Sequence, residues 1–279
     1  MMKTLSIIGA GRVGQTLGKL WAQKGVFEIH EVLNRSVESA SDAVGFLGVG
    51  QAVATINDMR PAELFMISVP DAQIAACARL LVQSGLLRAG NVVFHCSGAL
   101  PASDLEMARE SGVSVGSLHP VKSFVDPELA QGTFADSFCG IEGETEAVSV
   151  LWKACEAIGG RPFKIDPEFK TVYHAGAVIV CNYLTALLEW GMQCYDKAGI
   201  KRSAALKLIE PMVRDTVENI FQSGTVTALT GPIARGDHAV VAQQLKAMSQ
   251  CSERFGRLYQ DLGAIALSLS HAQGTASPE

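Results

Sequence analysis

The chain opens with a glycine-rich turn, and this turn constrains the fold more than any other feature. Residues 5–18 read LSIIGAGRVGQTLG, so three glycines in the spacing GxGxxG follow a predicted strand and precede a predicted helix. This is the context that a dinucleotide fingerprint requires. The glycines permit a tight turn, a close approach of the pyrophosphate and close helix–strand packing, and the helix N-terminus offers free amides to phosphate. We therefore expect cofactor contacts from Gly9, Gly11, Arg12, Val13 and Gly14.

The end of the second predicted strand indicates which dinucleotide binds. The strand EIHEVL is followed by Asn34, Arg35 and Ser36, with no carboxylate at its tip. NAD sites commonly place Asp or Glu here to bind the ribose 2′-hydroxyl, and such a carboxylate would repel a 2′-phosphate. Arginine can instead pair with the 2′-phosphate in a bidentate manner, and the neutral residues add donors. The sequence therefore predicts NADP(H), held in part by these three residues.

Two later strands end in small or turn-forming residues. The run FMIS precedes Val69 and Pro70, and the run VVFH precedes Cys96 and Ser97. In open α/β sheets, ligands bind outside the carboxyl ends of the strands, so these four residues are expected to line the cofactor. No base accompanies Cys96, so we do not expect a nucleophilic thiol there.

The first 166 residues alternate short apolar runs with helical patterns, whereas the remainder contains helical patterns only. Strands are expected at 4–8, 28–33, 64–68, 91–95, 114–118, 138–142 and 162–165, and helices between them at 13–24, 36–46, 72–81 and 145–158. Longer helices are expected at 168–198, 203–223, 237–248 and 251–270. This pattern predicts an α/β Rossmann fold with a doubly wound, mainly parallel sheet, followed by an all-helical C-terminal domain. The expected domains are a dinucleotide-binding domain, 1–166, and an all-α substrate and dimerisation domain, 167–279.

Composition excludes several classes of partner and site. The net charge is −5 and there is no basic run, which argues against nucleic acid. The 7 cysteines are scattered without a CxxC pair, which argues against a disulfide framework or a zinc site and favours the cytoplasm. The apolar stretch AGAVIVCNYLTALLEWG contains Asn182 and Glu189, so we interpret it as a buried helix and not as a membrane span.

That helix carries a polar stripe, in which the best candidates for proton transfer lie. At 100° per residue, Lys170, His174, Asn182, Thr185 and Glu189 fall within one sector of about 120°. Burial of such a stripe is costly unless it meets partners, water or ligand, so it either faces the cofactor cleft or forms a structural network between helices.

Imidazole titrates near neutrality, which makes His174 the first candidate for a general acid or base. Lys170, one turn earlier, could hold a substrate carboxylate or donate the proton itself. His119 follows a predicted strand in SLHP, so it too lies at the ligand edge and is a second candidate. We expect Asn182 and His119 to orient the substrate.

A further unusual stretch, ALTGPIARGD, interrupts the helical C-terminal sequence. Thr230 and Arg235 could bind an anionic group of the substrate, and Asp237 is expected to cap the next helix. The alternative is a simple turn between helices.

Six segments together resemble the Rossmann-like proteins with a C-terminal domain of unknown function: LSIIGAGRVGQTLG, SVPDAQI, FHCSGAL, SLHPVKSF, KTVYHAGAVIVCNYLTALL and ALTGPIARGD. These proteins are similar in architecture to pyrroline-5-carboxylate reductase, the deazaflavin-linked NADP reductases and the β-hydroxyacid dehydrogenases. The resemblance implies NADP(H) or NAD(H) as cofactor and a homodimer formed through the helical domain. The β-hydroxyacid dehydrogenases carry a catalytic lysine followed four residues later by asparagine, whereas here Lys170 is followed by His174.

The expected function is that of an NADP(H)-dependent oxidoreductase acting on a carbonyl or imine carbon of a small, carboxylate-bearing substrate. Two alternatives stay open: a protein that senses NADP(H) without turnover, and an oxidative decarboxylase of the prephenate dehydrogenase type, suggested by the strand end at His119.

Overall fold

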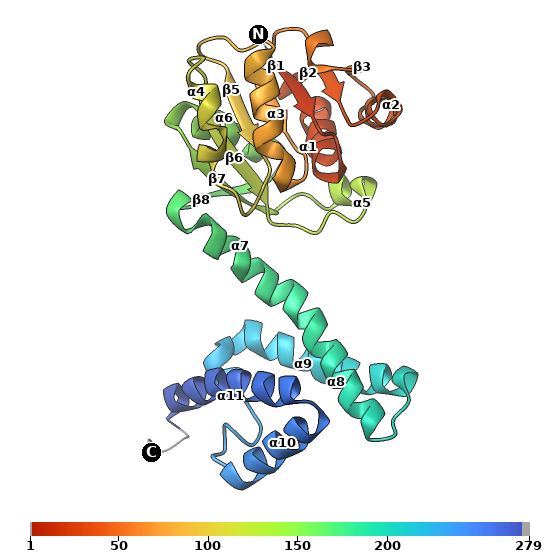
Figure 1. Cartoon of the computed structure of the whole chain (residues 1–279), viewed down its shortest axis with the longest axis vertical. Coiled ribbons are helices and arrows are strands. Elements are labelled where there is room, and N and C mark those ends of the chain that lie inside the picture. Colours follow the sequence, from red (N-terminus) through yellow and green to blue (C-terminus); the bar gives the residue numbers. More distant parts are fainter. Residues whose placement is uncertain (1, 275–279) are drawn as a thin grey trace. The chain divides into compact units, whose positions relative to one another are not determined.

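The computed structural model describes residues 2–274 and divides into two compact units, Met1–Leu184 and Thr185–Glu279 (Figure 1). The expected domain boundary at Asp166 follows the last strand of the sheet, and the division between the compact units lies further along, within a long helix.

The N-terminal unit is built on one eight-stranded sheet with the order β3-β2-β1-β4-β5-β6-β7-β8. The strands are β1 Lys3–Ile8, β2 Phe27–Leu33, β3 Gln51–Val53, β4 Leu64–Ile67, β5 Val92–His95, β6 Ser114–Pro120, β7 Phe138–Gly143 and β8 Arg161–Lys164. All neighbours pair in parallel except β6 and β7, which are antiparallel. The order of the first six strands is that of a Rossmann fold, and the prediction of this fold is confirmed. The sequence pattern missed β3, which has only three residues.

Helices cover both faces of this sheet because its central strands are apolar on both sides (Figure 1). One face packs against α1 Arg12–Gln23, α2 Val37–Leu47 and α6 Thr145–Ala157, with α5 Pro127–Gly132 beside α1. The other face packs against α3 Asp71–Gln83, the short η2 Ala102–Leu105 and α4 Glu106–Arg109. Since β1, β4, β5 and β6 are parallel, their carboxyl ends meet at one edge of the sheet.

The C-terminal unit is helical within the described residues, as expected. It contains α8 Leu184–Lys197, which begins at the last residue of the first unit, followed by α9 Arg202–Ala228, α10 His238–Cys251 and α11 Glu253–Gln273. Helix α9 is kinked at Gly224, which has a φ of 81°. The Asp237 side chain accepts a hydrogen bond from the amide of Val240, which confirms the predicted cap of α10.

The prediction that the long apolar helix is buried is wrong for the single chain. Residues 170–197 form α7 Lys170–Val178, a π-helical turn η4 Ile179–Tyr183, and α8. Lys170 is fully buried, but Val172, Ile179, Val180 and Tyr183 are more than half exposed. Apolar composition does not identify what covers a helix, and here only the first turn, at Lys170, reaches the core. By length and composition alone, Pro167–Lys197 could span a membrane.

Candidate functional site

The glycine turn has the geometry that each glycine was predicted to supply. Gly9 has a φ of +88°, and a Cβ there would lie 2.4 Å from Val69 Cγ1 and 2.9 Å from main-chain atoms of the same segment. A Cβ on Gly14 would lie 3.0 Å from the carbonyl oxygen of Gly9, so helix α1 can start this close only without a side chain. Gly11 has no atom within 4 Å of its Cβ position. The main chain is therefore open to a ligand at Gly11, which fits a dinucleotide pyrophosphate.

Asn34 holds this turn from the second strand. Its Oδ1 accepts a hydrogen bond of 2.6 Å from the amide of Ala10, and its Nδ2 donates to the carbonyl and hydroxyl oxygens of Ser39. The side chain thus joins the glycine turn to the loop before α2. Arg35 beside it is exposed, and Ser36 caps the N-terminus of α2, whose dipole favours an anion.

The strand ends after β4 and β5 lie at the same edge. Val69 contacts the glycine turn, and Pro70 directly precedes α3. The Ser97 hydroxyl accepts hydrogen bonds from the amides of Ala99 and Leu100, so it shapes the loop after β5. Burial raises the pKa of the Cys96 thiol to about 12, which keeps it protonated and argues against a nucleophilic role.

His95, which the sequence analysis did not select, organises that loop. The ring is fully buried, and its Nδ1 accepts a hydrogen bond of 3.1 Å from the amide of Ser97. Because Nδ1 must then be unprotonated, Nε2 carries the proton and donates to the carbonyl of Pro101 at 3.1 Å. Burial, with a smaller effect of Lys170, lowers the pKa of His95 to about 4. His95 is therefore a neutral structural residue.

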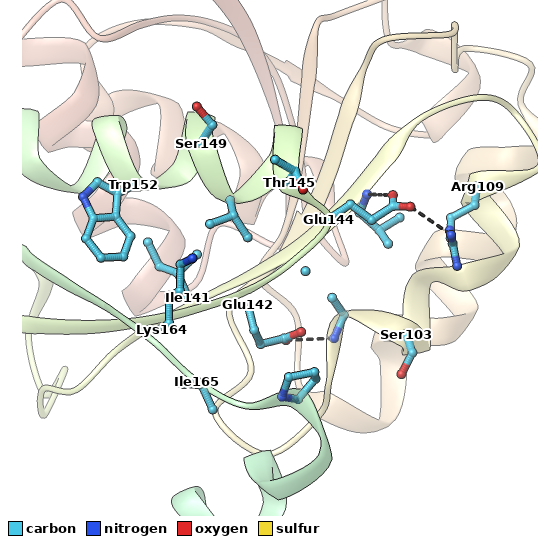
Figure 2. Close-up of a pocket in the computed structure, with 15 residues that line it drawn as sticks. Ser103, Arg109, Ile141, Glu142, Glu144, Thr145, Ser149, Trp152, Lys164 and Ile165 are labelled. Atoms are coloured by element: carbon cyan, nitrogen blue, oxygen red, sulfur yellow. Dashed lines mark hydrogen bonds and ion pairs between the residues drawn. The ribbon is translucent and has the colours of Figure 1, made fainter.

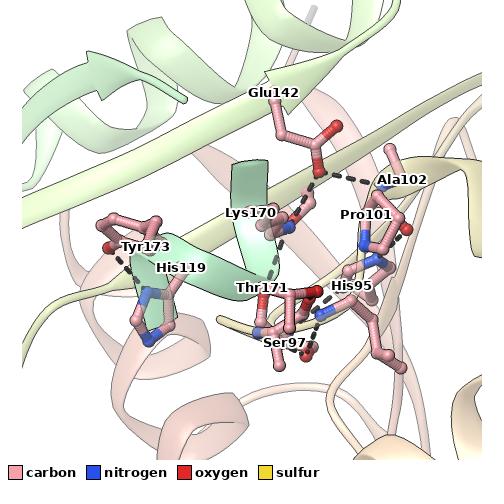
Figure 3. Close-up of polar contacts among 12 residues, drawn as sticks. His95, Ser97, Pro101, Ala102, His119, Glu142, Lys170, Thr171 and Tyr173 are labelled. Atoms are coloured by element: carbon pink, nitrogen blue, oxygen red, sulfur yellow. Dashed lines mark hydrogen bonds and ion pairs between the residues drawn. The ribbon is translucent and has the colours of Figure 1, made fainter. Parts of the chain in front are cut away.

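A buried ion pair anchors the first turn of α7 to the sheet (Figure 3). Lys170 Nζ donates to Glu142 Oε1 at 2.8 Å and to the hydroxyl of Ser117, and both charged side chains are at most 3% exposed. Burial lowers the pKa of Lys170, and the hydrogen bond and charge of Glu142 oppose this shift. Sequence reasoning missed Glu142 and Ser117, although a glutamate inside the apolar strand FCGIEG is a signal that could have been used.

The imidazole rings of His119 and His174 meet at Gly98, in the loop after β5. A Cβ on Gly98 would lie 2.6 Å from both His119 Nε2 and His174 Nδ1, so both nitrogens lie against the bare main chain of Gly98. The two ring centroids are 5.7 Å apart. His119 Nδ1 and the hydroxyl of Tyr173 form a hydrogen bond of 2.9 Å (Figure 3). His174 Nδ1 is buried, and no described residue hydrogen-bonds to it.

The pKa of His119 is affected by burial and by residues of α7 and α3. Burial, and then the neighbouring His174 and Lys170, lower the pKa of His119 to about 4, while Asp71 opposes the shift. The ring is thus neutral near pH 7. Asp71 begins the helix that follows Val69 and Pro70, and the sheet order places the ends of β4 and β6 on either side of β5. The residues that meet here form what we term the histidine–lysine cluster: His95, Ser117, His119, Glu142, Lys170, Tyr173 and His174.

Other predicted residues lie outside this cluster. Asn182 is exposed on η4, and Arg235 is exposed on the loop before α10 in the C-terminal unit, so their substrate roles stay predictions. Glu189 accepts hydrogen bonds from Arg202 and Gln193, which is the structural network considered as the alternative for the stripe.

Two family models match successive parts of the chain. The model of a Rossmann-like domain matches residues 2–120, and the model described as a domain of unknown function, DUF2520, matches residues 137–265. The chain combines a Rossmann-like domain with a DUF2520 domain. A comparison of the sequence with curated proteins found no match.

Solved structures share this architecture over nearly the whole length. A protein of Thermotoga maritima has 25% sequence identity and a TM-score of 0.79, with 97% of this chain and 99% of that chain covered. A Bacteroides fragilis protein proposed to be an NADP oxidoreductase has 22% identity and a TM-score of 0.72, with 96% and 98% covered. The imine reductase of Myxococcus stipitatus in complex with NADP+ has 19% identity and a TM-score of 0.62, with 96% and 93% covered. Pyrroline-5-carboxylate reductases share the fold as well. The Rossmann and DUF2520 domains thus have the architecture of known reductases.

Proposed function

We propose that this Rossmann–DUF2520 protein is an NADP(H)-dependent oxidoreductase that transfers a hydride to or from a carbonyl or imine carbon of a small, carboxylate-bearing substrate. One observation carries the proposal. His119 Nε2 and His174 Nδ1 lie together against Gly98, at the sheet edge that also carries the glycine turn. Titratable groups at a dinucleotide edge suit proton transfer coupled to hydride transfer.

The cofactor assignment rests on the chain's own residues. The open main chain at Gly11 would approach the pyrophosphate, and exposed Arg35 at the N-terminus of α2 would pair with a 2′-phosphate. When bound, the nicotinamide supplies or accepts the hydride. Neighbouring structures hold NADP+ or, in a variant of the same imine reductase, NAD+, so the fold itself allows both.

We assign the proton to His174 and a positioning role to Lys170. Lys170 Nζ donates to Glu142 and Ser117, whereas His174 Nδ1 has no partner among the described residues. The neutral His119 ring, hydrogen-bonded to Tyr173, would orient the reacting oxygen or nitrogen beside it. Arg235 is the proposed partner of the substrate carboxylate, and Asn182 a further orienting residue.

The test is a turnover assay at about 340 nm, where reduced nicotinamide absorbs. NADPH is offered with oxo acids, ketones, aldehydes and cyclic imines, and NADP+ with the matching alcohols and amines. Turnover of one class supports the proposal and names the reaction. Tight NADPH binding that is the same in the wild type and in His174→Ala, without any turnover, would instead favour a sensor. Release of carbon dioxide during NADP+ reduction would favour an oxidative decarboxylase.

Cofactor preference is tested separately with Arg35→Ala. The substitution is expected to weaken NADPH binding by about tenfold or more and to leave NADH binding within about twofold, because only NADPH carries the 2′-phosphate. Equal losses for both cofactors would contradict the assignment of Arg35.

We also propose a cytoplasmic homodimer formed through the helical domain. Exposed apolar side chains on that unit's helices support an interface, among them Leu187, Leu206, Met212, Phe221 and Ile265. The 7 free cysteines suit a reducing compartment. Light scattering in detergent-free buffer tests the dimer: a dimeric mass agrees, and a requirement for detergent would instead favour insertion of the apolar helix 167–197 into lipid.

A further inference from the structure

A cavity of about 610 Å³ lies at the C-terminal end of β7, in the N-terminal unit (Figure 2). It forms because β8 ends at Lys164, paired with Ile141, whereas β7 continues to Gly143. Gly143 pairs with Gly116 near the start of β6, so the cavity lies toward the amino ends of the parallel strands, away from the glycine turn. Its volume is typical of small-molecule sites.

The cavity has an apolar wall and several polar groups. Trp152 and Val148 from α6 and Ile165 after β8 line it, together with the polar residues Ser103, Thr145 and Ser149 (Figure 2). The charged lining residues include Arg109, which pairs with Glu144 at 3.0 Å, and Lys164. A fourth charged residue, Glu142, is the only member of the histidine–lysine cluster that also lines the cavity.

Glu142 presents an unused acceptor on this side. Lys170 Nζ and the amide of Ala102 both donate to Oε1, at 2.8 and 2.9 Å. Both of these hydrogen bonds use Oε1, whereas Oε2 accepts none from the described residues and points away from Lys170 (Figure 3). A carboxylate that is 3% exposed forms strong, charge-assisted hydrogen bonds with a cationic donor.

We propose that this cavity binds a small molecule with a primary ammonium group on an apolar body, with the ammonium group donating to Glu142 Oε2. The apolar body would pack against Trp152, Val148 and Ile165. Of the cationic lining residues, Arg109 is paired with Glu144 and Lys164 is exposed. At Glu142, a ligand carboxylate would therefore meet negative charge, and a neutral hydroxyl would form a weaker bond to the same oxygen. Because Glu142 also holds Lys170, an occupant would act on the histidine–lysine cluster through one shared carboxylate. This inference does not depend on the proposed oxidoreductase activity.

The experiment compares three probes with the same body: 2-phenylethylamine, 2-phenylethanol and 3-phenylpropanoate. Calorimetric titration of the full chain at pH 7 is expected to show binding of the amine at least about tenfold tighter than that of either other probe. In Glu142→Gln, which has lost the charge, the preference for the amine should fall to within about twofold. No amine binding at millimolar concentration, or equal binding of amine and alcohol, overturns the proposal.

A matched pair of variants locates the site without touching the ion pair. Val148→Phe fills the cavity from α6, whereas Val150→Phe adds the same volume to the same helix at a residue that does not line it. Val148→Phe should abolish amine binding, and Val150→Phe should retain it, with both melting temperatures near that of the wild type. Amine binding that survives Val148→Phe in a folded protein would place the probe elsewhere and overturn the assignment.

Discussion

The sheet edge carries two proposed sites that are built from different parts of the chain. The proposed pyrophosphate site is main chain within one short segment, whose geometry depends on the missing side chains of Gly9 and Gly14 and leaves Gly11 open. The proposed reaction site is made of side chains from β5, β6, β7 and α7, between residues 95 and 174. The first site therefore depends on local conformation, and the second depends on the tertiary structure that brings distant strands together.

The largest expected effect tests the reaction side. His174→Ala should reduce turnover by about 10²- to 10⁴-fold, because it removes the proposed proton donor, while the dissociation constant of NADPH stays within about twofold. Single-turnover kinetics and cofactor titration give the two quantities. Val172→Ala, on an exposed position of the same helix, should change neither. If NADPH affinity fell in parallel, the proposed nucleotide site and the proposed reaction site would not be independent of each other.

The buried ion pair should have the next largest effect, on stability. Glu142→Leu leaves Lys170 buried without a counter-charge and should lower the free energy of unfolding by roughly 3–5 kcal/mol, measured in urea. The double variant Glu142→Leu/Lys170→Met should recover most of that loss. Glu144→Gln, which affects a partly exposed pair with Arg109, should cost less than about 1 kcal/mol. Equal costs for the two glutamates would show that the pair is not an anchor.

On the nucleotide side, two glycines should respond differently to the same substitution. Gly11→Ala should leave the melting temperature unchanged, since its Cβ meets no atom within 4 Å, and weaken NADPH binding by about tenfold or more. Gly9→Ala should lower the melting temperature as well, because φ is +88° and the Cβ would collide with main-chain atoms. If Gly11→Ala binds NADPH normally, the pyrophosphate does not approach this turn.

The smallest effect concerns pH. The pKa values of His95 and His119, about 4 in the folded protein, lie below the ordinary value of 6.5. Between these values the unfolded chain binds protons that the folded chain does not, so stability is full above pH 6.5 and falls as the pH drops toward 4. Between pH 6.5 and pH 5.5 we expect a loss of about 1 kcal/mol for each ring. His119→Gln should flatten the urea-derived pH profile by about half, and exposed His238→Gln should leave it unchanged.

The difference between local and tertiary determinants also explains what the sequence could predict. The strand–turn–helix at Gly9 and the tip at Arg35 are local patterns, and so is the polar stripe that pointed to Lys170 and His174. Glu142 could not be paired with Lys170 in advance, because the pairing requires the antiparallel register of β7, in which Glu142 lies opposite Ser117. Tyr173 was hidden for the same reason, since its partner His119 is on a strand 54 residues away. The apolar helix was wrongly predicted to be buried in the single chain, because its composition shows that its surface is apolar but does not identify what covers that surface.

The position of Asn34 has a practical consequence for changing cofactor preference. Its amide joins the turn that would carry the pyrophosphate to the loop that would carry the ribose, so these two segments move as one piece. Substitution of Asn34 by a carboxylate, the obvious change toward NADH, would remove the donors to Ser39 and loosen the turn for either cofactor. A redesign should therefore retain Asn34 and change Arg35 and Ser36, so that selectivity is altered without dismantling the support that both cofactors share.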